Sequence, residues 1–354
     1  MKDCIIVGGG LAGVVFAHRL AERGKTFAII SNHSQRSSEV AGGIFNPVVL
    51  KRFSAVWNAS AQMQVSRDFY SAVEASLGER FFQSIPLYRK FASVQEQNDW
   101  FAASDREVLN DLLQAEVFSS SWKGIEALYG LGKVRHTGRL LVKEFLETSL
   151  RYFTELQLGD YQEVSFDYKE LRHTYDGVEY KGLEARRVVF CEGFGLIHNP
   201  FFNYLPLRPC KGELLTFRSP ELKCDAIVKS DGFIFRVGED EYKIGATYGW
   251  DDLTNTPTEE ARNELIHKLE NIISCPYEII AQEAAVRPTV IDRRPLLGQH
   301  PKWKNYWILN GLGTRGVMTA PYVSSILMDA IFERERIAHE MNIERFAKRY
   351  RKSV

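Results

Sequence analysis

The stretch DCIIVGGGLAGVVFAHRLAERGKTFAII, residues 3–30, decides the fold. An apolar run short enough for a buried strand precedes Gly8, Gly10 and Gly13, and a helical stretch and a second apolar run at 27–30 follow them. In the spacing G-x-G-x-x-G the three glycines permit a tight turn, the approach of a pyrophosphate to the backbone, and close helix–strand packing. The start of the helix adds free N–H groups and a positive dipole end. The sequence therefore predicts a Rossmann-type unit that binds a dinucleotide, without saying which one.

The second strand of this unit ends without the acidic residue that usually holds a ribose 2′-hydroxyl. Ser31 and Asn32 stand there instead, and Arg36 follows closely. A hydroxyl or an amide can still hydrogen-bond a ribose oxygen, but the charge-assisted bond is lost. Arg36 also leaves open an NADP enzyme, in which an arginine meets the 2′-phosphate. This strand end alone is compatible with a flavoprotein and with an NADP-dependent reductase.

The composition of the chain argues against several functional classes. Among 354 residues, 45 Lys+Arg balance 45 Asp+Glu, so the absence of a net charge argues weakly against a nucleic-acid partner. The five cysteines are scattered and never in C-x-x-C spacing, so we expect neither a metal site nor disulfides. No apolar run is long enough for a membrane span, and a strand that starts at residue 4 leaves no room for a signal peptide. We therefore expect a cytoplasmic protein without a membrane partner.

The rest of the chain alternates helical and strand-like patterns. Helices are predicted at 54–77, 142–153 and 257–273, the last with Thr256 or Thr258 near its start. The apolar run at 188–191 ends on a glycine and is expected to return to the first sheet. The stretches GELLTFRS, AIVKSDGFIFRV and EYKIGATYG predict an antiparallel sheet with hairpins. The charged stretch from 332 to the end is expected to be a solvated helical tail.

Three motifs occur in a fixed order after the glycine loop: AGGIFNPV at 41–48, VRPTVIDRRPLLG at 286–298 and NGLGTRGVMTAP at 310–321. With PLRPCKGELLTF at 206–217 and GFIFRVGEDEYKIGATYG at 232–249, they resemble the D-amino acid oxidase superfamily of FAD enzymes. Within it the likeness is to glycine oxidase and to the oxidase domain of the tRNA-modifying enzyme MnmC. The resemblance covers essentially the whole chain, and it implies FAD as the cofactor.

The resemblance and the alternation of patterns predict one fold class. It is α/β, with a Rossmann-like FAD-binding domain interleaved with a mostly antiparallel α+β substrate domain. Residues 1–80, 138–207 and 285–354 are expected to form the FAD-binding domain. Residues 81–137 and 208–284 are expected to form the substrate-binding domain.

The matched motifs also imply which residues bind FAD. Glycines before the last apolar helix let backbone N–H groups approach the flavin pyrimidine edge, and the helix N-terminus stabilises negative charge on the reduced flavin. Glu192 departs from the family, which usually has a small residue there. The expected FAD-binding residues are Gly8, Gly10, Leu11, Ala12, Gly13, Ser31, Asn32, Ala41, Gly42, Gly43, Gly193, Gly311, Gly313, Thr314, Arg315, Gly316 and Val317.

Two arginines are the candidates for the catalytic site. Amine oxidation requires orientation, because the Cα hydrogen must point at flavin N5, to which it passes as hydride. Arg287 is expected to grip the substrate carboxylate bidentately, as the arginine of the matching R-P motif does in the resembled family. A structural ion pair with Asp292 is the alternative. Arg315 is expected to hold a second carboxylate or to tune the flavin, unless it simply faces solvent. Tyr248 and Trp250 are candidates for an aromatic wall over the substrate, or for packing between domains.

These residues predict an FAD-dependent oxidoreductase that oxidises the C–N bond of a small primary or secondary amino acid, with oxygen as the expected electron acceptor. Three alternatives stay open at this point. They are a tRNA-modification-type oxidase related to the C-terminal domain of MnmC, an NADP-dependent reductase, and a non-catalytic flavin-binding protein.

Overall fold

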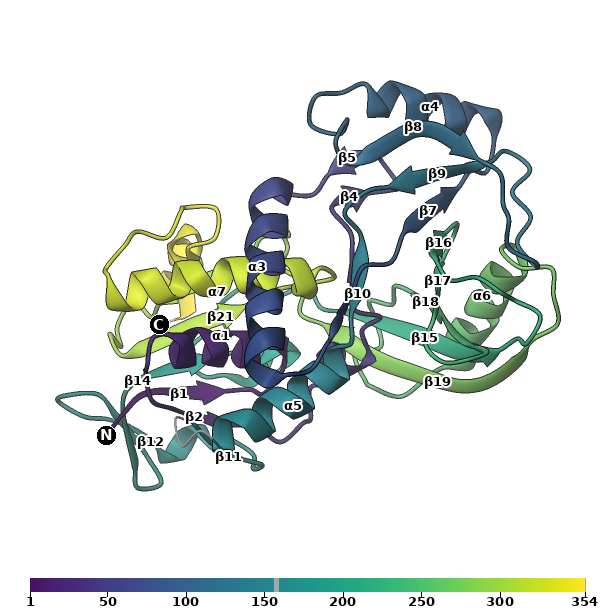
Figure 1. Cartoon of the computed structure of the whole chain (residues 1–354). Coiled ribbons are helices and arrows are strands. Elements are labelled where there is room, and N and C mark those ends of the chain that lie inside the picture. Colours follow the sequence, from purple (N-terminus) through teal and green to yellow (C-terminus); the bar gives the residue numbers. More distant parts are fainter. Residues whose placement is uncertain (156–158, 354) are drawn as a thin grey trace.

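A computed structural model of the chain describes residues 1–155 and 159–353. Two eight-stranded sheets form its two lobes, and both chain ends lie in the lobe of the first sheet (Figure 1). The core of the first sheet is parallel, in the order β11-β2-β1-β14-β21, and three antiparallel strands extend it. Its strands are β1 (Lys2–Val7), β2 (Phe27–Ile30), β11 (Gly159–Gln162), β12 (Leu171–His173), β13 (Val178–Tyr180), β14 (Leu183–Phe190), β20 (Leu296–Gln299) and β21 (Tyr306–Asn310).

The second sheet is mostly antiparallel, in the order β19-β15-β18-β17-β16-β7-β9-β8, and β16 and β7 form its parallel pair. The strands are β7 (Leu87–Lys90), β8 (Leu113–Phe118), β9 (Leu131–Val134), β15 (Cys210–Arg218), β16 (Ile227–Lys229), β17 (Phe233–Arg236), β18 (Glu241–Gly245) and β19 (Glu278–Arg287). Two small sheets complete the fold: one of β3 (Ile44–Phe45), β10 (Gly138–Leu140) and β6 (Phe82–Gln83), and one of β4 (Val48–Val49) with β5 (Ser54–Ala55).

Helices α1, α3, α5 and α7 cover the parallel sheet, and α4 and α6 lie in the other lobe (Figure 1). The α-helices are α1 (Leu11–Glu22), α2 (Ser37–Val40), α3 (Ala59–Leu77), α4 (Val94–Ser104), α5 (Val142–Glu155), α6 (Glu259–Glu270), α7 (Gly316–Phe332) and α8 (Ala347–Ser353). The 3-10 helices are η1 (Tyr168–Glu170), η2 (Gly193–His198) and η3 (Ile343–Phe346). None of the helices in the described ranges has the length and apolar character that crossing a bilayer requires.

The two sheets draw on alternating parts of the sequence. The first takes residues 2–30, 159–190 and 296–310, and the second takes residues 87–134 and 210–287. The predicted fold class, a Rossmann-like unit interleaved with a mostly antiparallel one, is therefore confirmed. The residue boundaries proposed for the two domains stay a prediction.

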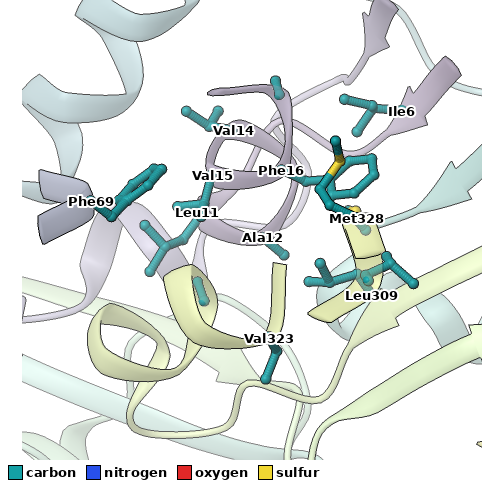
Figure 2. Close-up of a cluster of buried hydrophobic side chains, with 14 of the residues drawn as sticks. Ile6, Leu11, Ala12, Val14, Val15, Phe16, Phe69, Leu309, Val323 and Met328 are labelled. Carbon is teal, nitrogen blue, oxygen red and sulfur yellow. The ribbon is translucent and has the colours of Figure 1, made fainter. Parts of the chain in front are cut away.

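Helix α1 lies at the centre of the hydrophobic core around the parallel sheet. Figure 2 shows its side chains meeting Phe69 of α3, Leu309 of β21 and Met328 of α7. Gly13 lies where the helix crosses the glycine loop, and a Cβ built on it would lie 2.0 Å from the carbonyl oxygen of Gly8. Helix and strand can approach this closely only because residue 13 has no side chain, as the spacing of the glycines predicted.

Helix α1 also carries a buried histidine into this core. The imidazole of His18 is 2.8 Å from Ser149 Oγ and is surrounded by the rings of Phe69, Phe145 and Phe153. Burial lowers the pKa of His18 to about 3. The side chain is therefore neutral in the folded protein over the whole physiological pH range.

His18 is expected to make the fold sensitive to acid. Its pKa lies below the unfolded value of 6.5, so between pH 6.5 and 3 the unfolded chain binds a proton that the folded chain refuses. The free energy of unfolding should consequently fall by about 2 kcal/mol between pH 7.5 and pH 5 through this residue alone. Denaturant unfolding of wild type and His18→Gln, both saturated with FAD, measures this term as the difference in their pH dependence. Parallel pH profiles of the two proteins would contradict the assignment.

Two predicted elements differ from the structure. The helix predicted at 54–77 begins only at Ala59, because Ser54–Ala55 pairs with Val48–Val49 as a short hairpin and Asn58 turns the chain with a φ of 48°. The predicted helical tail is wrong for its first part, since residues 333–342 are not helical. The buried Met341 fixes that segment instead, and tertiary burial overrides the local helical pattern.

Candidate functional site

The carboxyl ends of the parallel strands and one face of the second sheet enclose a cavity of about 350 Å³. In open α/β sheets, ligands bind in the crevice outside these strand ends. Strand-end residues line one side of the cavity: Val7, Ile30, Cys191 and Asn310. Alternate residues of the second sheet line the other: Gly212, Leu214, Phe233, Phe235, Gly245, Ala285 and Arg287. The cavity is therefore the candidate site for both cofactor and substrate.

Two helix N-termini point into this cavity. Helix α1 begins at the glycine loop, where Gly8, Gly9 and Gly10 line the cavity, and α7 begins at the second glycine-rich turn. Neither helix has an acidic residue in its first turn. A helix N-terminus attracts negative charge, and FAD carries such charge on its pyrophosphate and, when reduced, on its flavin. The side-chain-free loop and the two helix ends thus fit FAD.

Most of the predicted cofactor residues meet in this cavity. The lining residues among them are Gly8, Gly10, Leu11, Ala12, Ser31, Asn32, Ala41, Gly42, Gly43, Gly193, Gly313, Thr314, Gly316 and Val317. Gly13, Gly311 and Arg315 are not among the lining residues. The backbone conformation and the close packing at position 311 require a glycine: the φ of Gly311 is +73°, and a Cβ there would lie 2.5 Å from Val290 Cγ2.

Arg315 lies in the second glycine-rich turn, as the N-cap of α7. Its Nη1 donates a hydrogen bond to the carbonyl oxygen of Asn46 at 2.8 Å, which ties α7 to the motif at 41–48. Burial lowers the pKa of Arg315 to about 10, with the nearby Arg52 acting in the same direction. The guanidinium therefore stays charged at neutral pH, and within the described residues it forms no ion pair. Of the alternatives for this residue, a simple solvent-facing position does not match its burial.

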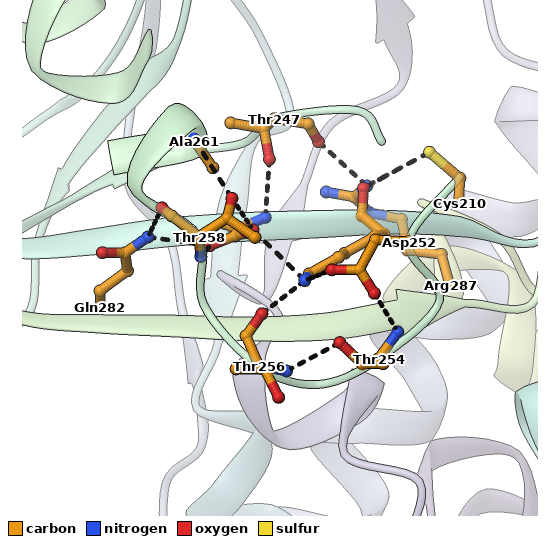
Figure 3. A network of polar contacts seen from close by, with 11 residues as sticks. Cys210, Thr247, Asp252, Thr254, Thr256, Thr258, Ala261, Gln282 and Arg287 are labelled. Carbon is orange, nitrogen blue, oxygen red and sulfur yellow. Dashed lines mark hydrogen bonds and ion pairs between the residues drawn. The ribbon is translucent and has the colours of Figure 1, made fainter. Parts of the chain in front are cut away.

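Arg287 ends β19 and lies against the cavity. Its Nη1 donates to the carbonyl oxygens of Lys211 at 3.3 Å and Thr247 at 3.2 Å (Figure 3). Its guanidinium carbon lies 4.9 Å from the ring centre of Tyr248, in cation–π geometry. A Cβ on Gly212 would lie 1.9 Å from Nη2, so the glycine makes the space that the guanidinium occupies. Two carbonyls, one ring and one glycine thus fix the direction of this arginine.

A buried polar network holds the segment that supplies Thr247 and Tyr248. Lys211 forms an ion pair with Asp252, and Glu213 accepts hydrogen bonds from Thr258 at 2.9 and 3.0 Å and from Gln282 at 2.8 Å (Figure 3). Lys211 and Glu213 are 3% and 2% exposed, so the hydrogen bonds of Glu213 are shielded from water, whereas the Asp252 side chain is 44% exposed. They anchor the loop after β18 to β15 and β19 on either side of Arg287.

Two alternatives from the sequence, an ion pair between Arg287 and Asp292 and an NADP site at Arg36, do not match the observed contacts. Asp292 does not pair with Arg287: it forms an ion pair with Arg345 at 2.8 Å and accepts the N–H of Arg294 at 3.1 Å, so it stabilises its own turn. Arg36, which an NADP site would need, forms an ion pair with Glu39 at 3.5 Å and does not line the cavity.

Sequence reasoning missed one wall of the cavity. Ser165, Phe166 and Tyr168 line it from the irregular segment after β11. Nothing in their local pattern marks them, because they reach the cavity through a tertiary contact: Asn32 Nδ2 donates to Ser165 Oγ at 2.9 Å. Glu192, noted only as unusual in the sequence, lies beside this wall.

The family model described as FAD dependent oxidoreductase (DAO) matches residues 3–330. The chain belongs to this family. It is accordingly an FAD-dependent oxidoreductase, and FAD is its cofactor. The NADP-dependent reductase considered from the strand end is thereby set aside. The match does not assign the individual residues, whose roles stay predictions.

Three relatives show where the chain stands within the family. Glycine oxidase of Pseudomonas aeruginosa is 22% identical over 353 residues, covering 94% of this chain and 95% of that protein. The bifunctional tRNA 5-methylaminomethyl-2-thiouridine biosynthesis protein MnmC of Pseudomonas fluorescens is 24% identical, covering 94% of this chain and 56% of that protein. The crystal structure of glycine oxidase from Bacillus cereus superposes with a TM-score of 0.80 at 19% identity, covering 96% of this chain and 99% of that one. The solved structure thus shares the fold of this chain over nearly its whole length.

Proposed function

We propose that the protein oxidises the C–N bond of a small primary or secondary amino acid whose carboxylate is bound by Arg287. One observation carries the proposal. Within the described residues Arg287 forms no ion pair, and its Nε and Nη2 make no hydrogen bond, while Nη1 is held by two carbonyls. A fixed guanidinium with a free N–H edge in a ligand cavity is suited to grip a carboxylate through two parallel bonds.

The surroundings of Arg287 support a role in orientation. Bound FAD supplies the hydride acceptor, so the chain itself has to hold the substrate Cα in a fixed position. The Tyr248 ring against the guanidinium and the Thr247 carbonyl restrict rotation of the arginine, and 61% exposure of Tyr248 places it at the mouth. Glu192 is the one carboxylate among the lining residues, and its hydrogen bonds tie it to Tyr168 and Asn199 rather than to the groups around Arg287. The ammonium proton of the substrate is therefore expected to leave to water rather than to a lining carboxylate.

Anaerobic bleaching of the flavin absorbance tests this function directly. Glycine, N-methylglycine and D-alanine form one panel, and methylamine, dimethylamine and ethylamine form the matched panel without carboxylates. At least one amino acid is expected to bleach the flavin, at least a hundredfold faster than its decarboxylated partner, because a charge-assisted pair contributes about 3 kcal/mol. Equal rates for both panels, or no bleaching by either, would contradict the proposal. Admission of air and measurement of hydrogen peroxide then test oxygen as the acceptor.

A second candidate is oxidation of an amine on a tRNA nucleoside. The match to MnmC proteins favours it, and so does an exposed pair close in sequence to the cavity-lining Tyr248: Trp250 is 43% exposed, and the guanidinium of Arg208 lies 4.8 Å from its ring centre. Aromatic rings and arginines are the groups on which unpaired bases stack. Unfractionated tRNA, added to the same anaerobic assay, should bleach the flavin if this candidate holds.

A further inference from the structure

Glu192 is a buried carboxyl group in the wall of the FAD cavity. It lies two residues after the end of β14, and its backbone nitrogen is 3.3 Å from a Cβ built on Gly8 of the glycine loop. Its two oxygens accept hydrogen bonds from the Tyr168 hydroxyl and from Asn199 Nδ2, the latter at 2.6 Å. Glu192 forms no ion pair within the described residues, although it is only 9% exposed. A buried acid without a cation needs another source of stabilisation.

Three contacts place this carboxyl next to the loop that follows β2. Tyr168, which holds one oxygen, belongs to the segment that Asn32 anchors through Ser165. From the other side, a Cβ on Gly195 would be 3.6 Å from both Gln35 Cγ and Glu192 Cβ. The loop after β2 is where a Rossmann unit places the ribose of its dinucleotide. Glu192 therefore lies at the adenosine end of the cavity.

This is also the end at which the chain lacks an acid. Ser31 stands where the β2 carboxylate would accept the ribose hydroxyl, and both Ser31 and Glu192 line the cavity. The two residues flank the glycine loop, since β2 and β14 are the two neighbours of β1. A carboxylate oxygen offers two lone pairs, so each oxygen of Glu192 can accept one bond beyond those from Tyr168 and Asn199.

We propose that Glu192 is an FAD ligand: its carboxylate accepts a hydrogen bond from an O–H or N–H donor of the adenosine moiety and so replaces the acid missing at position 31. The proposal concerns cofactor affinity and does not depend on which amine is oxidised. Two donors of adenosine share this chemistry, the ribose hydroxyls and the adenine amino group.

The titration of Glu192 gives the proposal a readout apart from activity. Burial raises the pKa of Glu192 to about 7, although the hydrogen bonds from Asn199 and Tyr168 act to lower it. The titratable groups that face it are the Tyr168 hydroxyl and the Cys191 thiol, and burial raises the pKa of both, so both are neutral. A donor on the ligand favours the charged carboxylate. FAD should consequently bind more tightly as the pH rises through about 7 and should reach a plateau above it.

The experiment measures FAD affinity of the full chain by flavin fluorescence, between pH 5.5 and 8.5. Wild type should gain about tenfold in affinity across this range. Glu192→Gln is nearly isosteric and should lose about tenfold at pH 8.5 and show a flat profile, because its acceptor is neutral. Tyr168→Phe removes a bond to the charged form and should move the midpoint to higher pH. Adding Ser31→Glu to Glu192→Gln should restore affinity.

Nucleoside diphosphates distinguish the two donors. ADP, 2′-deoxy-ADP and inosine diphosphate are compared for displacement of FAD from wild type and Glu192→Gln. If Glu192→Gln weakens the binding of ADP but not of 2′-deoxy-ADP, the donor is a ribose hydroxyl. If it weakens the binding of ADP but not of inosine diphosphate, the donor is the adenine amino group. Unchanged FAD affinity and an unchanged pH profile in Glu192→Gln, with or without a lower melting temperature, would overturn the proposal and leave Glu192 a structural residue.

Discussion

Gly10→Val is expected to yield a colourless protein that does not bind FAD but remains folded. Gly10 is the N-cap of α1, with φ −79° and ψ −172°, which is extended backbone that valine adopts without strain. A Cβ at this position would lie 3.2 Å from Ser38 Oγ, a tight contact that a small shift of the Ser38 side chain relieves. The branched methyl groups would then occupy the cavity at the helix N-terminus, where the pyrophosphate has to approach.

The size of the effect follows from the bonds that are lost. Each hydrogen bond between a backbone N–H and a charged phosphate oxygen contributes about 1.5–3 kcal/mol. Loss of two such bonds should weaken FAD binding by roughly two to four orders of magnitude. Absorbance of the purified protein and titration with FAD measure the loss, and circular dichroism with thermal melting shows whether the chain is folded.

Two other glycines supply the matched controls. Gly24 follows α1, and a Cβ there would meet nothing within 4 Å, so Gly24→Ala should keep full FAD affinity at a small cost in stability from its φ of +62°. Gly13→Ala should instead destabilise the whole unit, because its Cβ would lie 2.0 Å from the Gly8 carbonyl oxygen. A Gly10→Val protein with wild-type FAD affinity would show that the cofactor lies elsewhere.

The parallel sheet could be predicted from the sequence because its signals are local. The glycine spacing and the apolar runs at 27–30 and 188–191 each lie within a few residues, and β1, β2 and β14 form as expected. The start of α3 could not be predicted, because the pairing of β4 with β5 competes with the helix there. Likewise, the conformation of residues 333–342 is determined by the burial of Met341 in the core and not by the local pattern of charges.

The candidate site likewise has one part that the local sequence predicts and one part that it does not. The glycine turns could be located from spacing, but the partners of the two arginines could not. Arg287 meets Lys211 only because β15 and β19 pair in the register that sets Cys210 opposite Arg287. Arg315 bonds Asn46, 269 positions away in the sequence. Contacts at such separation depend on the assembled sheets, and no local pattern encodes them.

Arg287→Ala is expected to abolish the preference for amines that carry a carboxylate while leaving the FAD spectrum nearly unchanged. Truncation removes the guanidinium, which lines the cavity and whose Nε and Nη2 make no hydrogen bond within the described residues. Loss of a buried charge-assisted pair costs about 2–5 kcal/mol, which corresponds to roughly 30-fold to several-thousand-fold in kcat/KM. The decarboxylated analogue, which never uses this pair, should react at nearly the wild-type rate. Arg287→Lys should recover only part of the loss, because an ammonium cannot form the two parallel bonds.

Two further variants separate binding from packing. Arg294→Ala removes a guanidinium that also stacks on a ring, 5.1 Å from the centre of Trp57, but does not line the cavity, so both substrate types should be unaffected. Gly212→Ala keeps Arg287 but pushes its Nη2 aside, since the new Cβ would lie 1.9 Å from it. It should therefore show the same selective loss as Arg287→Ala, with the charge still present.

The measurement combines melting temperature, flavin content and the kinetics of an amino acid and its decarboxylated partner on the same preparations. If Arg287 binds the substrate carboxylate, Arg287→Ala should slow only the reaction of the amino acid. The melting temperature and the flavin content should then be unchanged. A residue that only fixes the loop after β18, through Lys211 and Thr247, would affect both substrates equally and lower the melting temperature. That second pattern would remove Arg287 as the substrate ligand and leave Arg315 as the next residue to test, because its guanidinium lies near Tyr248 and forms no ion pair within the described residues.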